Sequence, residues 1–163
     1  MSNTASIPIA IIDSRSGEKM IGYDKPFILK LAAGENLFES ILRCANDAKL
    51  PSASISGLGG LDDVSVAYYN LKTQQYQTKL FTGMYELISL NGNITVVEEQ
   101  RFIHIHAALG TEEYNVIGGH IMSAIVNPTV ELTIIPLASP IYRQFDAASG
   151  LKLMCTKLSY SSL

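Results

Sequence analysis

Apolar and polar residues alternate along most of this chain, and the spacing becomes helical in one segment. In residues 26–32, Phe27, Leu29 and Leu31 fall on one face of a predicted strand. Apolar residues then recur every three or four positions, which predicts an amphipathic helix over 37–49. Asn36 stands where a helix N-cap is expected, with Glu39 three residues later as its reciprocal acid.

Beyond residue 52 the pattern is almost entirely that of strands. The predicted strands are 54–58, 64–69, 75–81, 85–90, 94–97, 102–109, 116–126 and 129–137. Asn-Gly-Asn at 91–93 predicts a turn after the fourth of them. A short helix is expected over 139–145, where alternation is absent. The fold class predicted is α+β: one main helix packed on a central, mostly antiparallel sheet.

The 163 residues fit one domain, which we place at 25–157. Residues 1–24, rich in Ser, Gly and Asp, are expected to form a loose N-terminal segment, and 158–163 a frayed tail. The chain is 47% hydrophobic with a formal net charge of −3, which excludes an intrinsically disordered protein.

Charge and cysteine content narrow the function classes. The pI near 5.6 excludes a strongly basic nucleic-acid binder, since phosphate neutralisation drives most DNA affinity. Cys44 and Cys155 form no CxxC pair and predict two reduced thiols, hence a cytoplasmic protein. The N-terminus has no basic region before its apolar run, and the longest apolar stretch, 132–142, contains two prolines. Neither a signal peptide nor a membrane span is expected.

All three histidines of the chain fall within 17 residues: His104, His106 and His120. Residues i and i+2 of a strand point to the same side, so His104 and His106 share a face. The loop 110–115 returns the chain, which places His120 on the neighbouring antiparallel strand. If paired residue numbers add to an even value such as 226, His106 lies opposite His120 and the three imidazoles converge. An odd sum would put His120 in the core.

Three neutral imidazoles with an open fourth position suit zinc, and also nickel, copper or iron(II). The alternative is that they are ordinary hydrogen-bonded residues of a half-buried sheet face. Glu86 and Glu131 interrupt strand patterns at positions expected to be half-buried. They are the candidates for a ligand-orienting or acid–base carboxylate beside a metal-bound water. A small metalloenzyme that acts on an unknown small molecule is therefore one hypothesis.

Six stretches resemble, in order and spacing, a known family over about residues 25–155. They are 56–64 (SGLGGLDDV), 85–93 (YELISLNGN), 102–107 (FIHIHA), 118–121 (GGHI), 129–131 (TVE) and 143–146 (RQFD). The family is the PPC domain, conserved in plants and prokaryotes and joined to AT hooks in plant nuclear proteins. The pairing of HxHA with GGH is the specific part of the resemblance.

The resemblance implies an α+β fold, a compact homotrimer and, in stand-alone prokaryotic members, a metal site at the three histidines. Members often carry a DNA-binding label, but this chain has no Arg-Gly-Arg-Pro hook to enter a minor groove. The main hypothesis is a regulatory or DNA-associated PPC-like protein with a three-histidine zinc site. A scaffold trimer that acts through a protein partner is a further alternative, beside the metalloenzyme.

The strand 116–126 also suggests an assembly. Ile117, Ile121 and Ile125 are expected on one face, and Met122, Ala124 and Val126 on the other with His120. One helix covers only one face of a sheet, and the second face of an antiparallel sheet is usually polar. Since that face reads as apolar, we expect a neighbouring subunit to cover it.

Overall fold

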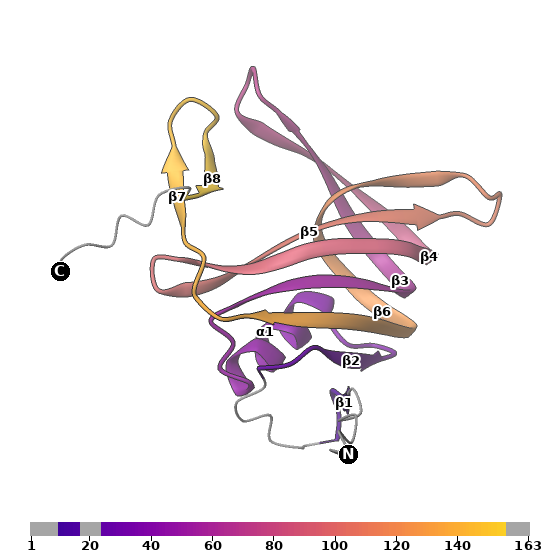
Figure 1. The fold of residues 1–163 in the computed structure, drawn as a ribbon. Helices are drawn as coiled ribbons and strands as arrows, with labels where there is room; N and C mark the ends of the chain where they lie inside the picture. The colour runs from indigo at the N-terminus through magenta and orange to yellow at the C-terminus, as the bar shows by residue number, and fades with distance from the viewer. Residues whose placement is uncertain (1–9, 17–23, 156–163) are drawn as a thin grey trace, which may run out of the picture.

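The computed structural model describes residues 10–16 and 24–155 (Figure 1). One helix and eight strands make up this part of the chain. They are β1 Ala10–Asp13, β2 Phe27–Ala32, α1 Leu37–Asp47, β3 Ser52–Asn70, β4 Gln75–Val97, β5 Gln100–Gly110, β6 Val116–Leu137, β7 Arg143–Asp146 and β8 Leu151–Met154.

Six strands form one sheet in the order β1-β2-β6-β3-β4-β5. The β1–β2 pair is parallel and the other pairings are antiparallel. The first part of β6 pairs with β5 as well, so β3, β4, β5 and β6 form a closed ring of pairings. The strands β7 and β8 form a separate hairpin above the sheet (Figure 1). The predicted α+β class, with a largely antiparallel sheet and one helix, is confirmed.

The helix α1 begins where the sequence predicts. The Asn36 side-chain oxygen accepts hydrogen bonds from the backbone N–H groups of Phe38 and Glu39, at 3.0 and 3.1 Å. The predicted apolar stripe is buried: Leu37, Ile41, Cys44, Ala45 and Ala48. It packs with Phe27, Leu29 and Leu31 of β2, each at most 1% exposed, in one hydrophobic core. Local periodicity was therefore sufficient to define this half of the molecule.

Several short predicted strands merge into long ones, and the turn predicted at 91–93 is wrong. Asn91, Gly92 and Asn93 lie inside β4, paired on one side with β3 and on the other with β5. A side chain at Gly92 would overlap the carbonyl oxygen of His104 on β5. The glycine thus serves a close approach of two strands, and tertiary pairing overrides the local turn preference.

The short helix predicted over 139–145 is also wrong. Residues Arg143–Asp146 form β7, in register with Leu151–Met154 of β8. This hairpin lies outside the six-stranded sheet, and Gln144 and Phe145 are exposed. Alternation is missing because neither face of the hairpin is fully covered by the core, and the segment carried no helical signal of its own.

The predicted faces of 116–126 need a correction as well. On β3, Val66 pairs with Ile121 and Ser65 with Ser123, so Met122 is an extra residue and forms a bulge. The bulge shifts the alternation, and Ala124 and Val126 join Ile121 in the core, each at most 1% exposed. Met122 is 44% exposed. The expected apolar outer face of this strand is therefore reduced to Met122.

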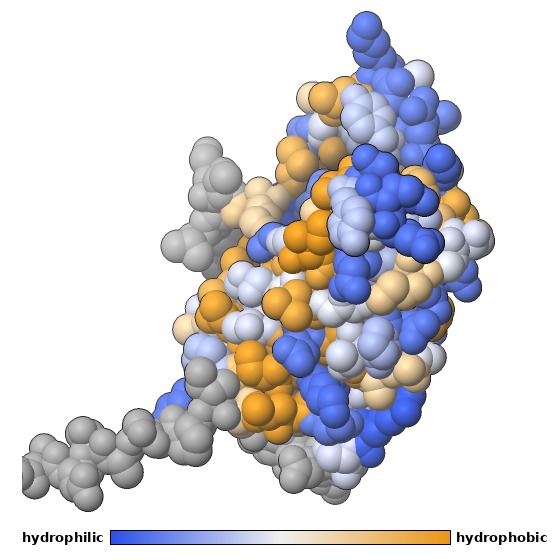
Figure 2. All heavy atoms as spheres, turned by 90° about the vertical axis from the view of Figure 1, so that its right-hand side faces the viewer, coloured by the Kyte–Doolittle hydropathy of each residue, from blue (hydrophilic) through white to orange (hydrophobic). Residues whose placement is uncertain are grey.

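Apolar side chains do remain on the surface elsewhere. Figure 2 shows apolar groups gathered at the centre and lower left of one face, among polar ones. The exposed large apolar side chains on β3, β4 and β6 include Leu58, Leu80, Met84, Ile88, Val116 and Ile135. No helix among the described residues is long and apolar enough to cross a membrane.

The strand β1 lies within the predicted N-terminal segment 1–24 and pairs with β2. Glu35, just before the helix, connects β1, β2 and α1 through its carboxylate. The carboxylate accepts hydrogen bonds from the Ser14 hydroxyl after β1 and from the Ala32 N–H of β2. It also accepts hydrogen bonds from the side chains of Ser40 and Arg43 of α1. Most of the remainder of 1–24, and the predicted tail 158–163, lie outside the described residues.

Candidate metal centre and its pocket

The three histidines converge where β6 is paired on both sides. His120 lies opposite His106 of β5 and opposite Ala67 of β3. The register with an even sum is therefore confirmed. One ring nitrogen from each of His104, His106 and His120 can be chosen so that all three lie within 4.8 Å of one another. The Nε2 atoms of His104 and His106 are 3.1 Å apart.

Two glycines precede His120, and the first has a packing reason. A side chain at Gly118 would overlap the carbonyl oxygen of Ala107 on β5. Without a side chain, β6 comes close enough to β5 to set the histidines in register. The GGH motif is thus a structural condition for the cluster, and the HxH motif supplies the other two rings from one face of β5.

The cluster fits a tetrahedral metal. Zinc–nitrogen bonds of about 2.0–2.1 Å place two imidazole nitrogens about 3.3 Å apart. The 3.1 Å between the two Nε2 atoms is close to this value. The three ring nitrogens lie within 4.8 Å of one another, so the third ring would move closer by up to about 1.5 Å to complete the set. All three residues offer the same donor type, and no carboxylate or thiolate belongs to the described cluster.

Burial keeps His104 and His120 in the form that binds a metal. Burial lowers the pKa of His104 to about 4, with further lowering by His120, Arg143 and His106. Burial, and then His106, also lowers the pKa of His120 below its ordinary value. Both rings are neutral at pH 7, and neutral imidazole is the form that binds a metal.

The histidines line a pocket of about 490 Å³ that also borders β3, β4, β7 and β8. Aromatic rings supply much of its wall: Tyr68, Tyr69, Tyr76 and Phe102. The ring of Tyr76 is 5.1 Å from that of His120, between centroids, and 4.8 Å from that of Tyr69. The volume and the mostly apolar wall are those of a small-molecule site.

Arg143 of β7 is the pocket residue that sequence reasoning missed. Its Nη2 lies 3.3 Å from Nδ1 of His104 and donates to Oδ1 of Asn93 at 3.0 Å. Its Nε donates to the Thr95 hydroxyl at 2.9 Å and its Nη1 to the Lys152 carbonyl at 3.0 Å. No periodicity pointed to Arg143. The one signal was its place in a stretch that resembles the PPC domain.

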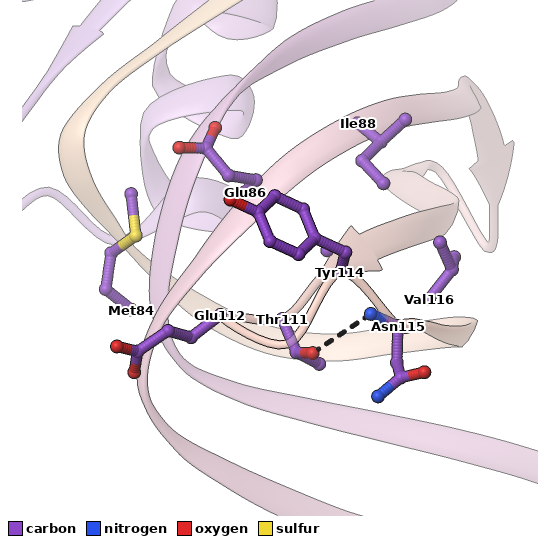
Figure 3. Close-up of a pocket in the computed structure, with 9 residues that line it drawn as sticks. Met84, Glu86, Ile88, Thr111, Glu112, Tyr114, Asn115 and Val116 are labelled. Carbon is purple, nitrogen blue, oxygen red and sulfur yellow. Dashed lines mark hydrogen bonds between the residues drawn. The ribbon is translucent and has the colours of Figure 1, made fainter.

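The two candidate carboxylates lie elsewhere. Glu131 and Glu86 are both exposed, so their expected half-burial is wrong. Glu86 lines a separate pocket of about 710 Å³ with Met84, Glu112 and Tyr114 (Figure 3). Glu131 lines a third hollow of about 300 Å³. Neither residue lines the histidine pocket, so the structure does not bring them together with the metal cluster.

Comparison with solved structures finds the same fold in prokaryotic proteins. A "putative DNA binding protein" from Bacteroides thetaiotaomicron is 25% identical, with a TM-score of 0.78 over 83% of this chain and 94% of that one. A metal-containing protein from Archaeoglobus fulgidus is 32% identical, with a TM-score of 0.76 over 80% and 93%. A PPC protein from Pyrococcus horikoshii is 28% identical, with a TM-score of 0.74 over 80% and 90%.

A search of curated protein sequences finds no match. The family comparison does: the model of the Plants and Prokaryotes Conserved (PCC) domain, the PPC domain of the resemblance, matches residues 19–138. That range includes α1, most of the sheet and all three histidines. This chain therefore belongs to the Plants and Prokaryotes Conserved domain family.

Proposed function

We propose that this chain is a metal-binding PPC-domain protein in which His104, His106 and His120 hold one divalent transition metal, most suitably zinc, at the wall of a small-molecule pocket. The observation that carries the proposal is the convergence of three ring nitrogens, one from each histidine, within 4.8 Å. Zinc favours such a set because it accepts tetrahedral nitrogen coordination without a further preference from d electrons. A relative of the same fold is named a metal-containing protein.

Three protein ligands leave a fourth position for water or a ligand, as in catalytic rather than structural zinc sites. A zinc ion so bound polarises a ligand oxygen or lowers the pKa of its water. The chain's own part is to shape the surroundings: the rings of Tyr76 and Phe102 form part of the pocket wall, and the Arg143 guanidinium lies beside the His104 ring. The proposal therefore extends to a site that binds a small molecule, including the metalloenzyme hypothesis.

Elemental analysis of the purified protein tests the metal site. We expect about one zinc per chain after dialysis against zinc, and a loss in His106→Ala because two imidazoles rarely retain zinc. Tyr114→Ala, an exposed change on the β5–β6 hairpin outside the site, is the matched control and should keep the metal. Stoichiometric zinc in a variant with all three histidines replaced by alanine would refute the assignment.

DNA binding, the function in the name of one relative, is the weaker reading for this chain. Its net charge is −3, and phosphate contacts need clustered cations. We expect a mobility-shift titration at physiological salt to give dissociation constants no tighter than the non-specific range of about 10⁻⁴–10⁻⁶ M. Nanomolar binding that depends on sequence would favour the DNA-binding role instead.

We further propose that the chain works as a homotrimer. The support is the family resemblance together with exposed apolar side chains such as Met84, Ile88 and Met122, which are 47%, 53% and 44% exposed. Analytical ultracentrifugation should give a trimer at micromolar concentration, and Met122→Asp should weaken it. Because Ala124 is a core residue, Ala124→Asp would unfold the chain and is not a valid interface test. A wild-type monomer would contradict the proposal.

A further inference from the structure

We propose, on the basis of the proposed metal site, that the histidine pocket binds small organic carboxylates and that the Arg143 guanidinium receives the carboxylate beside the metal. The inference concerns the class of ligand, which the metal cluster alone leaves open. It rests on the charge of the pocket, on the neutral partners of Arg143 in the pocket wall and on the composition of that wall.

The pocket has cations and no anion. None of the described residues that line it is acidic, whereas Arg143 and Lys152 both line it. Lys152 has an ion pair with Glu98 at 3.6 Å, but both groups are well exposed and the pair is weak. Imidazole ligands carry no negative charge, so they would leave the two charges of a bound zinc uncompensated. A positive site in an apolar wall favours an anionic ligand, since charges removed from water need a partner.

Arg143 can be compared with Arg101, an arginine whose described hydrogen-bond acceptors are also neutral. Arg101 donates twice to the carbonyl of Leu50 and once to Asn46, next to the C-terminal end of α1. The positive charge of Arg101 is therefore stabilised by the partial negative charge at the C-terminal end of the helix. Arg143 has neutral acceptors too, but it meets no helix end and lies in the wall of a pocket.

Arg143 also has donors to spare. A guanidinium has five N–H groups, of which Thr95, Lys152 and Asn93 take three in good geometry. A fourth is directed at Nδ1 of His104, and within residues 10–16 and 24–155 no acceptor faces the second N–H of Nη1. A neutral His104 that binds metal through Nε2 carries its proton on Nδ1 and no longer accepts from Arg143. One N–H on each Nη is then available, which matches the two oxygens of a carboxylate.

The rest of the wall selects an organic acid over inorganic phosphate. Tyr68, Phe102, Leu151 and Leu153 offer apolar surface, which the body of an organic acid covers and an inorganic phosphate leaves uncovered. A volume of about 490 Å³ accommodates a small molecule with an aromatic or aliphatic body. The predicted ligand is thus a carboxylate with an oxygen donor beside it that reaches the metal.

Calorimetric titration of the zinc-loaded protein with mandelate tests this inference, with mandelamide as the neutral probe of the same shape. Mandelate should bind at least about tenfold more tightly than mandelamide, the effect of one charged hydrogen-bonding group. Arg143→Gln should reduce mandelate affinity at least tenfold and leave the zinc content unchanged, while Arg143→Lys should recover part of it. Arg101→Gln is the matched control and should bind mandelate as the wild type does.

Because Arg143 also anchors β7, Arg143→Gln could fail to fold. Asn93→Asp then serves as the second variant: it keeps the acceptor that Arg143 uses but places a competing carboxylate on the guanidinium. It should fold and weaken mandelate binding at least tenfold. Zinc is measured in every sample, so absence of zinc from the wild type would refute the metal site and this inference together. Bound zinc with equal affinity for mandelate and mandelamide, or with inorganic phosphate preferred, would overturn this inference alone.

Discussion

The helix-covered half and the histidine end of this domain are held together in different ways. Under α1, stability comes from a continuous apolar core in which Phe27, Leu31 and Leu37 are fully buried. At the histidine end, the ring of strands is completed by the β5–β6 pairing, and Arg143 ties β7 to β4 by hydrogen bonds to Asn93 and Thr95. Burial maintains the first region, and specific polar contacts arrange the second.

Because of this difference, we expect the helix-covered half to determine stability and the histidine end to determine ligand binding. In a packed core, the loss of side-chain volume at any position lowers stability. In a polar site, the arrangement depends on each individual hydrogen-bond donor and acceptor. Substitutions under the helix should therefore change the free energy of unfolding, and substitutions at the histidines should change ligand binding. The predictions below test that separation, beginning with the largest expected effect.

Removing core volume under α1 should have the largest effect on stability. Ile41 is 1% exposed, so Ile41→Ala should lower the free energy of unfolding by about 2–5 kcal/mol in a urea titration. Leu42, the next residue of the same helix, is 37% exposed and serves as the control. Leu42→Ala should cost less than about 1 kcal/mol, and equal losses in the two variants would refute the predicted packing of α1.

At the histidine end the stability effect should appear only when metal is present. His106 is exposed, so His106→Ala should change the unfolding free energy of the metal-free protein by less than about 0.5 kcal/mol. With free zinc at 100 times its dissociation constant, the wild type should gain about 2.7 kcal/mol and the variant should not. Thermal unfolding with and without zinc measures both quantities. A zinc-dependent gain that persists in His106→Ala would contradict the ligand assignment.

The structure of the helix-covered half was predicted from the sequence more accurately than that of the histidine end. The helix, its cap at Asn36 and its buried stripe follow from neighbouring residues, so local patterns suffice. The faces of β6 could not be predicted beyond His120, because the bulge at Met122 depends on how β3 pairs with it. The turn expected at Asn91 failed for a similar reason: pairing on both sides keeps the segment extended.

The helix cap gives a smaller effect in the same half. Asn36→Ala removes the acceptor for the N–H groups of Phe38 and Glu39 and should cost about 1 kcal/mol of unfolding free energy. Asn36→Asp keeps the acceptor and should stay close to the wild type. Zinc content should be the same in both variants. A change in zinc binding on loss of the cap would show that the two halves are coupled more tightly than we infer.

The two thiols give the smallest test, which concerns reactivity rather than stability. Burial raises the pKa of Cys44 to about 12, with a further contribution from Asp47, whereas Cys155 is half-buried. A thiol reagent such as 5,5′-dithiobis(2-nitrobenzoate) at pH 8 should modify one cysteine per chain rapidly, and mass spectrometry should locate it at Cys155. Cys44 should react only in denaturant, because only the thiolate is reactive. Rapid modification of Cys44 in the native protein would indicate that the core under α1 opens readily.

For the site itself, the sequence predicted the histidine cluster better than its surroundings. HxH and GGH have spacings that strand geometry can interpret, so the convergence of His104, His106 and His120 was predictable once the register was assumed. Arg143 reaches the cluster from a hairpin 23 residues beyond His120, and only the fold determines that position. The exposed positions of Glu86 and Glu131 likewise could not be derived from alternation alone.

X-ray absorption spectroscopy at the zinc edge tests the central claim most directly, because it counts the ligands of the bound metal. The zinc-loaded wild type should show three imidazoles and one oxygen at about 2.0–2.1 Å and no sulfur. Any zinc that remains with His106→Ala should show at most two imidazoles. A sulfur ligand from either cysteine, or an unchanged three-imidazole spectrum in His106→Ala, would contradict the three-histidine site.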